Sequence, residues 1–410
     1  MAFAGKLRRV LIIVENLPVP FDRRVWQEAT TLHANGYQVS VICPKGKGFD
    51  AGYEVVDGIH IYRHALPIEA EGALGYAMEY GTALFWEFFL AWRVLFTRGF
   101  DVIHACNPPD LIFIVGLFFR LLGKRFLFDH HDINPELYEA KFGRRDFFYK
   151  LMVWAEWLTF KTATVSIATN ESYKRIAIDR GGMDPDKVFV VRSGPSLERL
   201  QIMPPVGSLK RGRRFLVGYV GVMGKQEGID ILLRVVRHLV YECGRQDIHF
   251  GLVGGGTSLD ELQLYAQELR VADFVTFTGR VSDHDMLEML NTADVCVNPD
   301  VPNEMNDKST MNKIMEYMAL GKPIVQFDLT EGRVSAQQAS LYARNNDEID
   351  FAKKLLELLD NDELRREMGE FGRQRVLTEL QWKHEIPNLL QAYDVLFGSG
   401  TATTAASTMR

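Results

Sequence analysis

A single carboxylate, Glu316, lies in the otherwise apolar stretch "KSTMNKIMEYMALGKPIV" (308–325). Removing a carboxylate from water is costly unless a cation or a hydrogen-bond donor pairs with it. On a helix over 311–320, Lys313 and Glu316 are three residues apart and share a face with Asn312. The partner of Glu316 is therefore either a neighbour on this helix or a ligand.

The same stretch begins with a lysine and two hydroxyl residues, Lys308, Ser309 and Thr310, at the expected helix start. Free backbone N–H groups and the positive end of the helix dipole favour an anion there, which fits a phosphate site. The residues also fit a simpler arrangement. In that alternative, Ser309 or Thr310 only caps the helix and Lys313 pairs with Glu316.

Three loops elsewhere in the second half of the chain could bind the same ligand. The stretch "GYVGVMGKQEGID" (218–230) has four glycines and Lys225 between an expected strand and an expected helix. A second glycine-rich turn is "LVGGGTS" (252–258), and Arg280 follows a third strand. Loops that follow parallel strands meet at one edge of a sheet, where α/β folds bind ligands.

The elements that would position these residues alternate between short β-rich runs and helical patterns, as in doubly wound α/β domains. A hairpin is expected around Asp57-Gly58, and a charged helix over 350–370. We expect an N-terminal Rossmann-like domain over 1–195, a linker over 196–213, a C-terminal Rossmann-like domain over 214–378, a helix over 379–398 that packs back on the N-terminal domain, and a disordered tail over 399–410.

Composition excludes several classes of protein. The 410 residues carry a formal net charge of −6, which argues against a nucleic-acid partner. The four cysteines form neither a CxxC pattern nor a dense disulfide framework, and they are expected to be small apolar fillers. The apolar stretches 81–96 and 111–123 contain charges and are too short to span a bilayer. We expect a cytoplasmic protein.

The order of these motifs, ending in "IMEYMALGKPIV", resembles glycosyltransferase family 4 over roughly residues 7 to 395. The resemblance implies the GT-B fold, an α/β architecture in which two Rossmann-like doubly wound domains face each other across a cleft. It also implies that Glu316 accepts hydrogen bonds from the ribose hydroxyls of a nucleotide-sugar donor. Its partner would then be a sugar diol.

The resemblance assigns further donor contacts. Ser309 and Thr310 would face the diphosphate, Lys313 would neutralise it, and Arg280 with Val281 would flank the base. The implied substrate-binding residues are Gly221, Gly224, Lys225, Gly255, Arg280, Val281, Lys308, Ser309, Thr310, Lys313 and Glu316.

The sequence departs from the family's pattern at three positions. Lys308 stands where the family has a second glutamate that touches the donor sugar, with Asp307 the nearest carboxylate that could replace it. Val222 and Glu227 stand where an arginine and a lysine usually bind the diphosphate. Lys225 and Lys313 could supply the missing positive charge. These departures affect the identity of the sugar more than the fold.

In the first half, "LFDHHDINPELY" (127–138) resembles the strand end where the family places a histidine near the transferred sugar. His131, followed by an aspartate, fits this position best, with His130 adjacent. A structural role for either histidine is the alternative. Arg23 and Arg24 are either contacts for an acceptor phosphate or solvated charges at a helix start.

The resemblance therefore predicts a retaining hexosyltransferase with His131 and Glu316 in catalysis. It would move a sugar from a UDP- or GDP-sugar to a glycan or a lipid-linked glycan in cell-surface polysaccharide assembly, without cofactor or metal. In the family the leaving diphosphate is thought to assist attack on the same face. A nucleotide-sugar epimerase on the same fold, or a scaffold without activity, are the alternatives.

A peripheral contact with the inner face of the membrane is also expected. Residues 141–161 place five cations among aromatic residues, a composition typical of an interfacial helix. The cations are Lys141, Arg144, Arg145, Lys150 and Lys161, and the aromatic residues include Phe147, Phe148, Trp154 and Trp157. The alternative is that this helix buries its aromatic residues on the sheet of the N-terminal domain.

Overall fold

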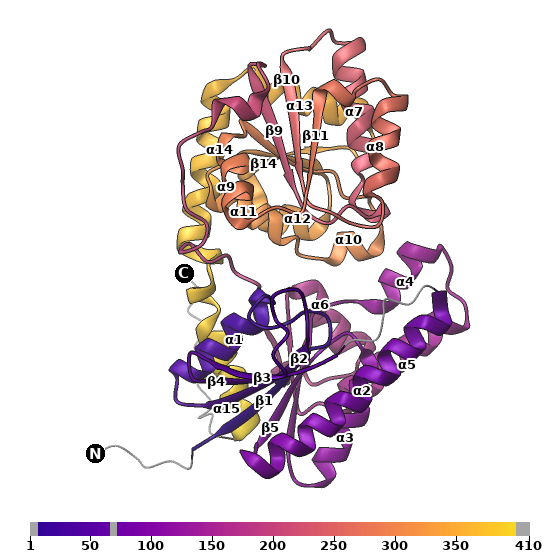
Figure 1. The fold of residues 1–410 in the computed structure, drawn as a ribbon, viewed down its shortest axis with the longest axis vertical. Coiled ribbons are helices and arrows are strands. Elements are labelled where there is room, and N and C mark those ends of the chain that lie inside the picture. The colour runs from indigo at the N-terminus through magenta and orange to yellow at the C-terminus, as the bar shows by residue number, and fades with distance from the viewer. Residues whose placement is uncertain (1–6, 66–71, 399–410) are drawn as a thin grey trace, which may run out of the picture. The chain divides into compact units, whose positions relative to one another are not determined.

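The computed structural model describes residues 7–65 and 72–398 (Figure 1). The chain divides into two compact units. Unit 1 comprises residues 1–139, 144–192 and 385–410, and unit 2 comprises residues 140–143 and 193–384. The tail over 399–410, expected to be disordered, lies outside the described residues.

Unit 1 is built on an eight-stranded sheet with the order β3-β4-β2-β1-β5-β6-β7-β8. Its pairs are parallel except β3–β4, an antiparallel hairpin whose turn residues Asp57 and Gly58 both have positive φ. Both features were expected from the sequence. The strands are β1 (Arg9–Ile13), β2 (Gln38–Pro44), β3 (Tyr53–Val56), β4 (Ile59–His64), β5 (Val102–Cys106), β6 (Arg125–His130), β7 (Val165–Ala168) and β8 (Val188–Val190).

Helices connect the strands of unit 1 along the chain, and one further helix comes from the end of the chain. They are α1 (Arg23–Ala34), α2 (Gly72–Thr97), α3 (Phe113–Leu121), α4 (Asn134–Phe142), α5 (Phe147–Thr162), α6 (Glu171–Arg175) and, from the end of the chain, α15 (Ile386–Phe397). Helix α15 contacts β7 and β8. Its Tyr393 is fully buried and shares a hydrogen bond of 2.9 Å with Nδ1 of His104 on β5.

Unit 2 is built on a six-stranded parallel sheet with the order β11-β10-β9-β12-β13-β14. The strands are β9 (Phe215–Val220), β10 (Ile248–Val253), β11 (Val275–Gly279), β12 (Val295–Asn298), β13 (Ile324–Phe327) and β14 (Ser340–Ala343). The central strands are fully buried because helices cover both faces of the sheet (Figure 1).

The helices of unit 2 are α7 (Ile229–Tyr241), α8 (Leu259–Glu268), α9 (Asp283–Thr292), α10 (Glu304–Lys308), α11 (Asn312–Ala319), α12 (Thr330–Ala336), α13 (Glu348–Leu359) and α14 (Asp362–Arg375). The single charged helix expected over 350–370 is wrong. It is two helices, because α13 ends at Leu359 and the side chain of Asn361 accepts a hydrogen bond from the N–H of Leu364, which caps the start of α14.

Residues 193–206, here called the connecting segment, pack on unit 2 without forming a helix or a strand. Leu200 is buried in the cluster that contains Ile314 and Met315 of α11. The backbone N–H of Met203 donates to the side chain of Asn291 at 3.1 Å. The segment therefore reaches α11 as well as joining the two units.

Two expectations about surface and membrane can be compared with the structure. Cys43, Cys106 and Cys296 are buried fillers, whereas Cys243 is exposed, so the expectation is wrong for that residue. Within the described ranges, no helix combines the length and the apolar character that crossing a bilayer requires.

Glu87 on α2 should make the stability of unit 1 depend on pH. It is fully buried, and neither carboxylate oxygen has a hydrogen-bond partner among the described residues. Burial and the charge of Glu15 raise its pKa to about 8, so the folded protein holds a proton that the unfolded chain releases above its ordinary pKa of 4.5. Stability should therefore fall as pH rises from about 5 to 8, by up to about 4 kcal/mol.

Urea denaturation of the wild-type protein and of Glu87→Gln at pH 5 and pH 8 checks this prediction. The variant is expected to lose much less stability between the two pH values than the wild type. An equal loss in both proteins would show that Glu87 does not cause the dependence.

Candidate functional site

The loops after β9, β10 and β11 lie side by side at the C-terminal edge of the sheet of unit 2. The N–H of Met223 donates to the carbonyl of Gly255, and the N–H of Gly254 donates to the carbonyl of Gly279, both at 3.0 Å. Ser258 in turn donates its N–H to Met223 at 2.9 Å. The backbone of these loops is therefore fixed mainly by its own hydrogen bonds.

Glycine is required in these loops by close contacts between backbones. A Cβ on Gly254 would lie 1.8 Å from the carbonyl oxygen of Gly221, and one on Gly228 would lie 2.0 Å from that of Pro299; both glycines have positive φ. Gly221 and Gly224 would meet only side chains, and Gly255 would meet nothing closer than 4.0 Å. Sequence reasoning named Gly221, Gly224 and Gly255 and missed Gly228, Gly254 and Gly256, where an added Cβ would collide with backbone atoms.

Lys313 of α11 is buried beneath the first loop. Its Nζ donates to Asp300 at 2.7 Å and to Glu227 at 2.8 Å, and it lies 4.9 Å from the centre of the Tyr219 ring. Burial would lower the pKa of Lys313, but the charge of Asp300 and its other neighbours raise it well above its usual value. The alternative of an ion pair between Lys313 and Glu316 is therefore wrong, because Lys313 is held by two other carboxylates.

Asp300 and Glu227 neutralise the positive charge of Lys313. Burial raises the pKa of Asp300 to about 7, so this carboxyl group is partly ionised near neutral pH. With Asp300 ionised, the two carboxylates outweigh the one ammonium group. Lys313 would thus attract a phosphate only weakly while both carboxylates remain beside it.

Removing the charge of Glu227 should strengthen the binding of anions at this edge. In Glu227→Gln, Lys313 keeps its contact with Asp300 but loses one neutralising charge, worth about 1 kcal/mol to an anion several ångströms away. We expect UDP or GDP to bind roughly fivefold tighter, with no change for the uncharged nucleoside, in calorimetric titration. The matched control is Glu242→Gln, an exposed glutamate at the end of α7. Equal gains for nucleoside and nucleotide would contradict the prediction.

Glu316 pairs with an arginine that sequence reasoning did not identify. Nη2 of Arg199, in the connecting segment, donates to Oε1 of Glu316, and its Nη1 lies 3.6 Å from Oδ2 of Asp283 on α9. Both Arg199 and Glu316 keep part of their side chains exposed. Ile314 and Met315 anchor the buried side of the helix.

The expected roles of Lys308, Ser309 and Thr310 as the start of α11 need correction. Lys308 ends the preceding helix α10 and pairs with Glu304 at 3.3 Å. Ser309 caps that same helix at its C-terminus, with its hydroxyl donating to the carbonyl of Met305 at 2.7 Å. Helix α11 instead begins after Met311, which offers no side-chain cap.

Other residues of the expected donor site are distributed around the same edge. Lys225 is exposed in the loop after β9, and Arg280 and Val281 follow β11. Arg280 is exposed and Val281 packs against the cluster under α11. Asp307, expected as a substitute carboxylate, accepts hydrogen bonds from the N–H and hydroxyl of Thr330, at 2.8 and 3.0 Å.

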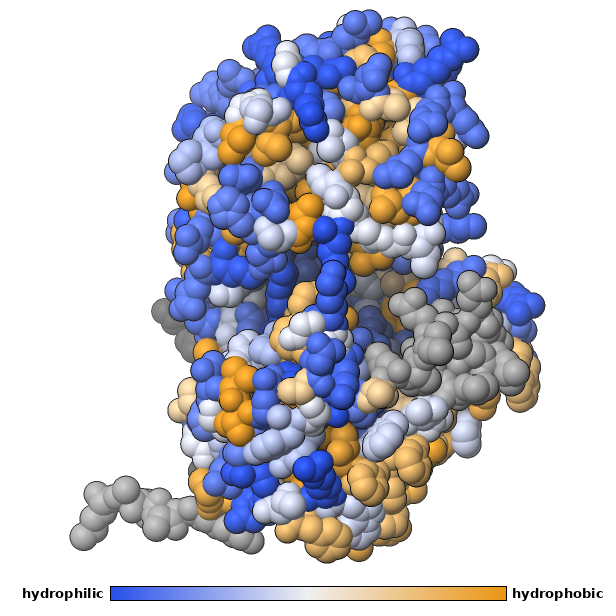
Figure 2. All heavy atoms as spheres, viewed as in Figure 1, coloured by the Kyte–Doolittle hydropathy of each residue, from blue (hydrophilic) through white to orange (hydrophobic). Residues whose placement is uncertain are grey.

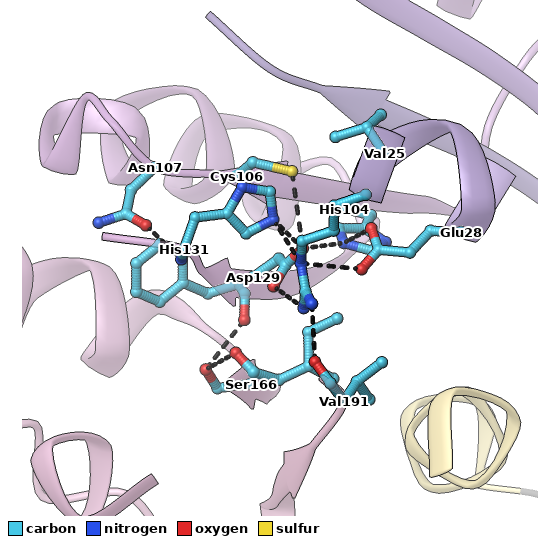
Figure 3. Close-up of polar contacts among 12 residues, drawn as sticks. Val25, Glu28, His104, Cys106, Asn107, Asp129, His131, Ser166 and Val191 are labelled. Atoms are coloured by element: carbon cyan, nitrogen blue, oxygen red, sulfur yellow. Dashed lines mark hydrogen bonds and ion pairs between the residues drawn. The ribbon is translucent and has the colours of Figure 1, made fainter. Parts of the chain in front are cut away.

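A second group of chemistry-bearing side chains lies in unit 1, at the ends of β5 and β6 (Figure 3). Arg24 of α1 donates from Nη2 to Oδ1 of Asp129 at 2.7 Å and from Nε to Nε2 of His131 at 2.9 Å. His131 also contacts Oδ2 of Asp129 through the same ring nitrogen. Its backbone N–H donates to the side chain of Asn107 at 2.7 Å. His131 is thus held by both its ring and its backbone.

Burial sets the charges of this cluster. It would raise the pKa of Asp129, but Arg24 and His131 hold that pKa well below its usual range. Burial and the charge of Asp129 raise the pKa of Glu28 well above its usual value, whereas the charge of Arg24 lowers it. Burial also lowers the pKa of His104. Arg24 and Asp129 are therefore the charged pair at its centre.

The same side chains have the spacing of metal ligands, but a metal does not fit. Glu28, Cys106, Asp129 and His131 each offer an atom within 4.8 Å of the others. The guanidinium of Arg24 already occupies the position that a metal ion would take. Its Nε lies 3.2 Å from Glu28, 3.1 Å from Asp129 and 2.9 Å from His131. A second cation there would meet this fixed positive charge.

The sequence expectation for Arg24 needs correction, and His130 has the structural role that was the alternative for it. Arg24 is not available to an acceptor phosphate, because it is buried and bound to Asp129 and to the carbonyl of Val191 at 2.7 Å. Arg23 is exposed. His130 is fully buried near the rings of Phe128, Phe160 and Tyr173, 3.4 Å from Glu156. Its position is that of a core residue.

Comparison with known proteins decides the family. The family described as "Glycosyltransferase Family 4" matches residues 22–199, and the family described as "Glycosyl transferases group 1" matches residues 214–361. The chain belongs to glycosyltransferase family 4. Between them, the matches include most of the chain and the candidate residues of both units. The expected family and enzyme class, a hexosyltransferase, are confirmed.

Relatives of this family 4 chain include a phosphatidyl-myo-inositol mannosyltransferase from Mycobacterium leprae, 23% identical, with 96% of this chain and 97% of the relative aligned. A D-inositol 3-phosphate glycosyltransferase from Corynebacterium jeikeium is 26% identical, and the aligned part covers 46% of this chain and 45% of that relative. The solved sucrose-phosphate synthase from Thermosynechococcus elongatus is 18% identical, with a TM-score of 0.79 over 96% of this chain and all of that one. The expected GT-B fold is confirmed.

Sequence reasoning on this family 4 protein did not identify four residues that belong to the charged clusters of the two units: Arg199, Asp300, Asp129 and Glu28. Only Asp129 had a local signal, because it precedes the two histidines at a strand end. Arg199 lies in a segment without periodicity, and its pairing with Glu316 spans 117 positions.

Proposed function

We propose that the protein is a retaining glycosyltransferase that moves a hexose from a UDP- or GDP-sugar to a hydroxyl of a glycan or lipid-linked glycan in cell-surface polysaccharide assembly. Glu316 carries the proposal. It is a partly exposed carboxylate at the edge of unit 2 where three strand-to-helix loops meet, and the family resemblance assigns it the ribose hydroxyls. A carboxylate accepting from two hydroxyl groups makes strong, charge-assisted hydrogen bonds.

In this proposal the residues of unit 2 bind the donor and those of unit 1 act on the transferred sugar. The loop amides and Lys225 hold the diphosphate, and Arg280 with Val281 flanks the base. His131 of unit 1 stabilises the sugar as the bond to the diphosphate breaks. The leaving diphosphate accepts the proton of the attacking hydroxyl on the same face, which retains the configuration at the sugar. The protein thus contributes orientation and charge stabilisation.

The acceptor class rests on the relatives. The Mycobacterium leprae relative is named for a phosphatidyl-inositol acceptor, and the Corynebacterium jeikeium relative for an inositol phosphate. A lipid-linked or phosphorylated polyol acceptor is therefore the class we favour. We propose that no metal or cofactor is needed, because Lys225 and loop amides can hold the diphosphate.

Incubating the purified chain with a panel of nucleotide sugars and lipid-linked acceptors tests this proposal. The expected result is nucleoside diphosphate release that depends on an acceptor and survives EDTA. Glu316→Ala should lower kcat/KM for the donor by about 10- to 150-fold. A strict requirement for Mg²⁺ or Mn²⁺ would contradict the metal-independent site.

The same panel separates the two alternatives. An epimerase would produce a new nucleotide sugar without an acceptor, and a scaffold would produce nothing. One observation favours the scaffold over the epimerase: Asp300 and Glu227 neutralise Lys313, and Val222 and Glu227 stand where the family usually has cations that bind the diphosphate. Weak or absent donor binding in calorimetry would support the scaffold.

We also propose that α5 contacts an anionic membrane surface. Its aromatic side chains are exposed, among them Phe147, Trp154 and Trp157, which supports this contact over packing on the sheet. Exposed apolar side chains continue onto α2 and α3, and Figure 2 shows apolar residues gathered over that part of unit 1. The exposed cations at the start of α5 provide charge complementary to anionic lipids.

Replacing Arg144, Arg145 and Lys150 together with serine should weaken membrane binding. At low salt, the wild-type protein is expected to sediment with phosphatidylglycerol vesicles, and the triple variant to lose roughly tenfold or more in affinity, since each cation near the surface contributes about 1 kcal/mol. The matched control replaces the exposed Arg344, Arg366 and Lys353 of unit 2 with serine. Equal binding by wild type and triple variant would contradict the proposal.

A further inference from the structure

The ion pair between Arg199 and Glu316 joins the expected ribose-binding carboxylate to a residue outside its own helix. Nη2 of Arg199 donates to Oε1 of Glu316. The neighbouring lysine, Lys313, cannot take this role because Asp300 and Glu227 hold it. Arg199 is thus a cation that faces Glu316.

The chain that follows Arg199 is held against unit 2. Leu200 is buried at 2% exposure against the core beneath α11. Farther along the connecting segment, the N–H of Met203 donates to Asn291 at 3.1 Å, and the N–H of Val206 donates to Thr292 at 2.8 Å. These contacts fix the backbone that carries Arg199, and so they limit where its guanidinium can reach.

Stability alone does not explain an arginine here. Its Nη1 is buried and has no hydrogen-bond partner in the described part of the chain; the nearest acceptor, Oδ2 of Asp283, is 3.6 Å away. A buried donor without a hydrogen bond costs free energy, and an apolar side chain at such a position often gives an equally stable protein. The ion pair is easier to explain if the role of Arg199 is to orient the carboxylate of Glu316.

We infer that Arg199 is a positioning residue of the donor site, whose pairing with Glu316 holds that carboxylate where it accepts from the ribose hydroxyls and so gives the site its preference for ribose over deoxyribose. The inference rests on the proposed function, because it takes Glu316 as the ribose ligand. Without Arg199, the flexible glutamate side chain would sample other rotamers and lose hydrogen bonds to the diol.

Calorimetric titration of the full chain with UDP, GDP and their 2′-deoxy and 3′-deoxy analogues tests this role. The wild-type protein is expected to bind one ribonucleotide at least about tenfold more tightly than its deoxy analogues, because charge-assisted hydrogen bonds are lost in the analogues. In Arg199→Gln the preference should fall below about threefold, mainly through weaker binding of the ribonucleotide. Arg199→Met, which keeps the apolar stem, should lose the preference equally.

Two further variants make the outcomes distinguishable. Arg366→Gln, at an exposed position of α14, should keep the wild-type preference, and Glu316→Gln should lose it. If Glu316→Gln keeps the preference, the proposed donor site is wrong. If Glu316→Gln loses it while Arg199→Gln or Arg199→Met keeps it, only the inference about Arg199 is overturned.

Discussion

Replacing Arg24 with methionine is expected to lower the free energy of unfolding by about 3–5 kcal/mol, the usual cost of breaking a buried ion pair from one side. Asp129 is fully buried and would lose two hydrogen bonds from the guanidinium, at 2.7 and 3.1 Å. The carbonyl of Val191 would lose a third, so the contact between α1 and the chain after β8 would weaken as well.

The adjacent Arg23 offers a matched control, because it is on the same helix but exposed. In equilibrium urea denaturation, Arg23→Met should change stability by no more than about 0.5 kcal/mol. The double variant Arg24→Met/Asp129→Leu should recover part of the loss, since it removes both buried charges. Equal effects of Arg23→Met and Arg24→Met would contradict the account of this cluster.

Replacing His131 with alanine is expected to reduce kcat by about 100-fold or more while the donor dissociation constant changes little. This pattern is typical of a group that acts mainly in the transition state. His131 is partly exposed, and Arg24 and Asp129 fix its ring, so its removal should affect the reaction more than the binding of the nucleotide.

His130 is the control for that experiment. It is fully buried among aromatic rings, so His130→Ala should lower the melting temperature more than His131→Ala does. It should lower kcat less than His131→Ala does. The comparison of melting temperature and turnover in the two variants checks both statements. A larger loss of kcat in His130→Ala than in His131→Ala would show that the wrong histidine has been assigned to the site.

The fold could be predicted from sequence because its signals are local. Apolar strands alternate with amphipathic helices, and the helix expected over 311–320 is α11, Asn312–Ala319. The expectation failed where a short polar break was overlooked. Asp360 and Asn361 separate α13 from α14, and an asparagine followed by acidic residues is a helix-start signal that could have been used.

The candidate site was predictable only in part, because its charges meet through the tertiary structure. Glu316 stood out as an isolated carboxylate, but its partner Arg199 is 117 positions away. Arg24 and Asp129 are 105 positions apart. Even the nearer contact of Lys313 with Asp300, 13 positions away, connects α11 to the loop between β12 and α10. Periodicity identifies which residues are buried, but not which charges pair.

Hydrogen–deuterium exchange of the full chain, with and without saturating UDP or GDP, tests most directly whether this edge of unit 2 binds the donor nucleotide. The account predicts slower exchange of backbone amides in residues 221–228, 254–258 and 309–316 with one of the two nucleotides, and a loss of that protection in Glu316→Ala. Protection confined to other segments, or unchanged protection in the variant, would contradict it.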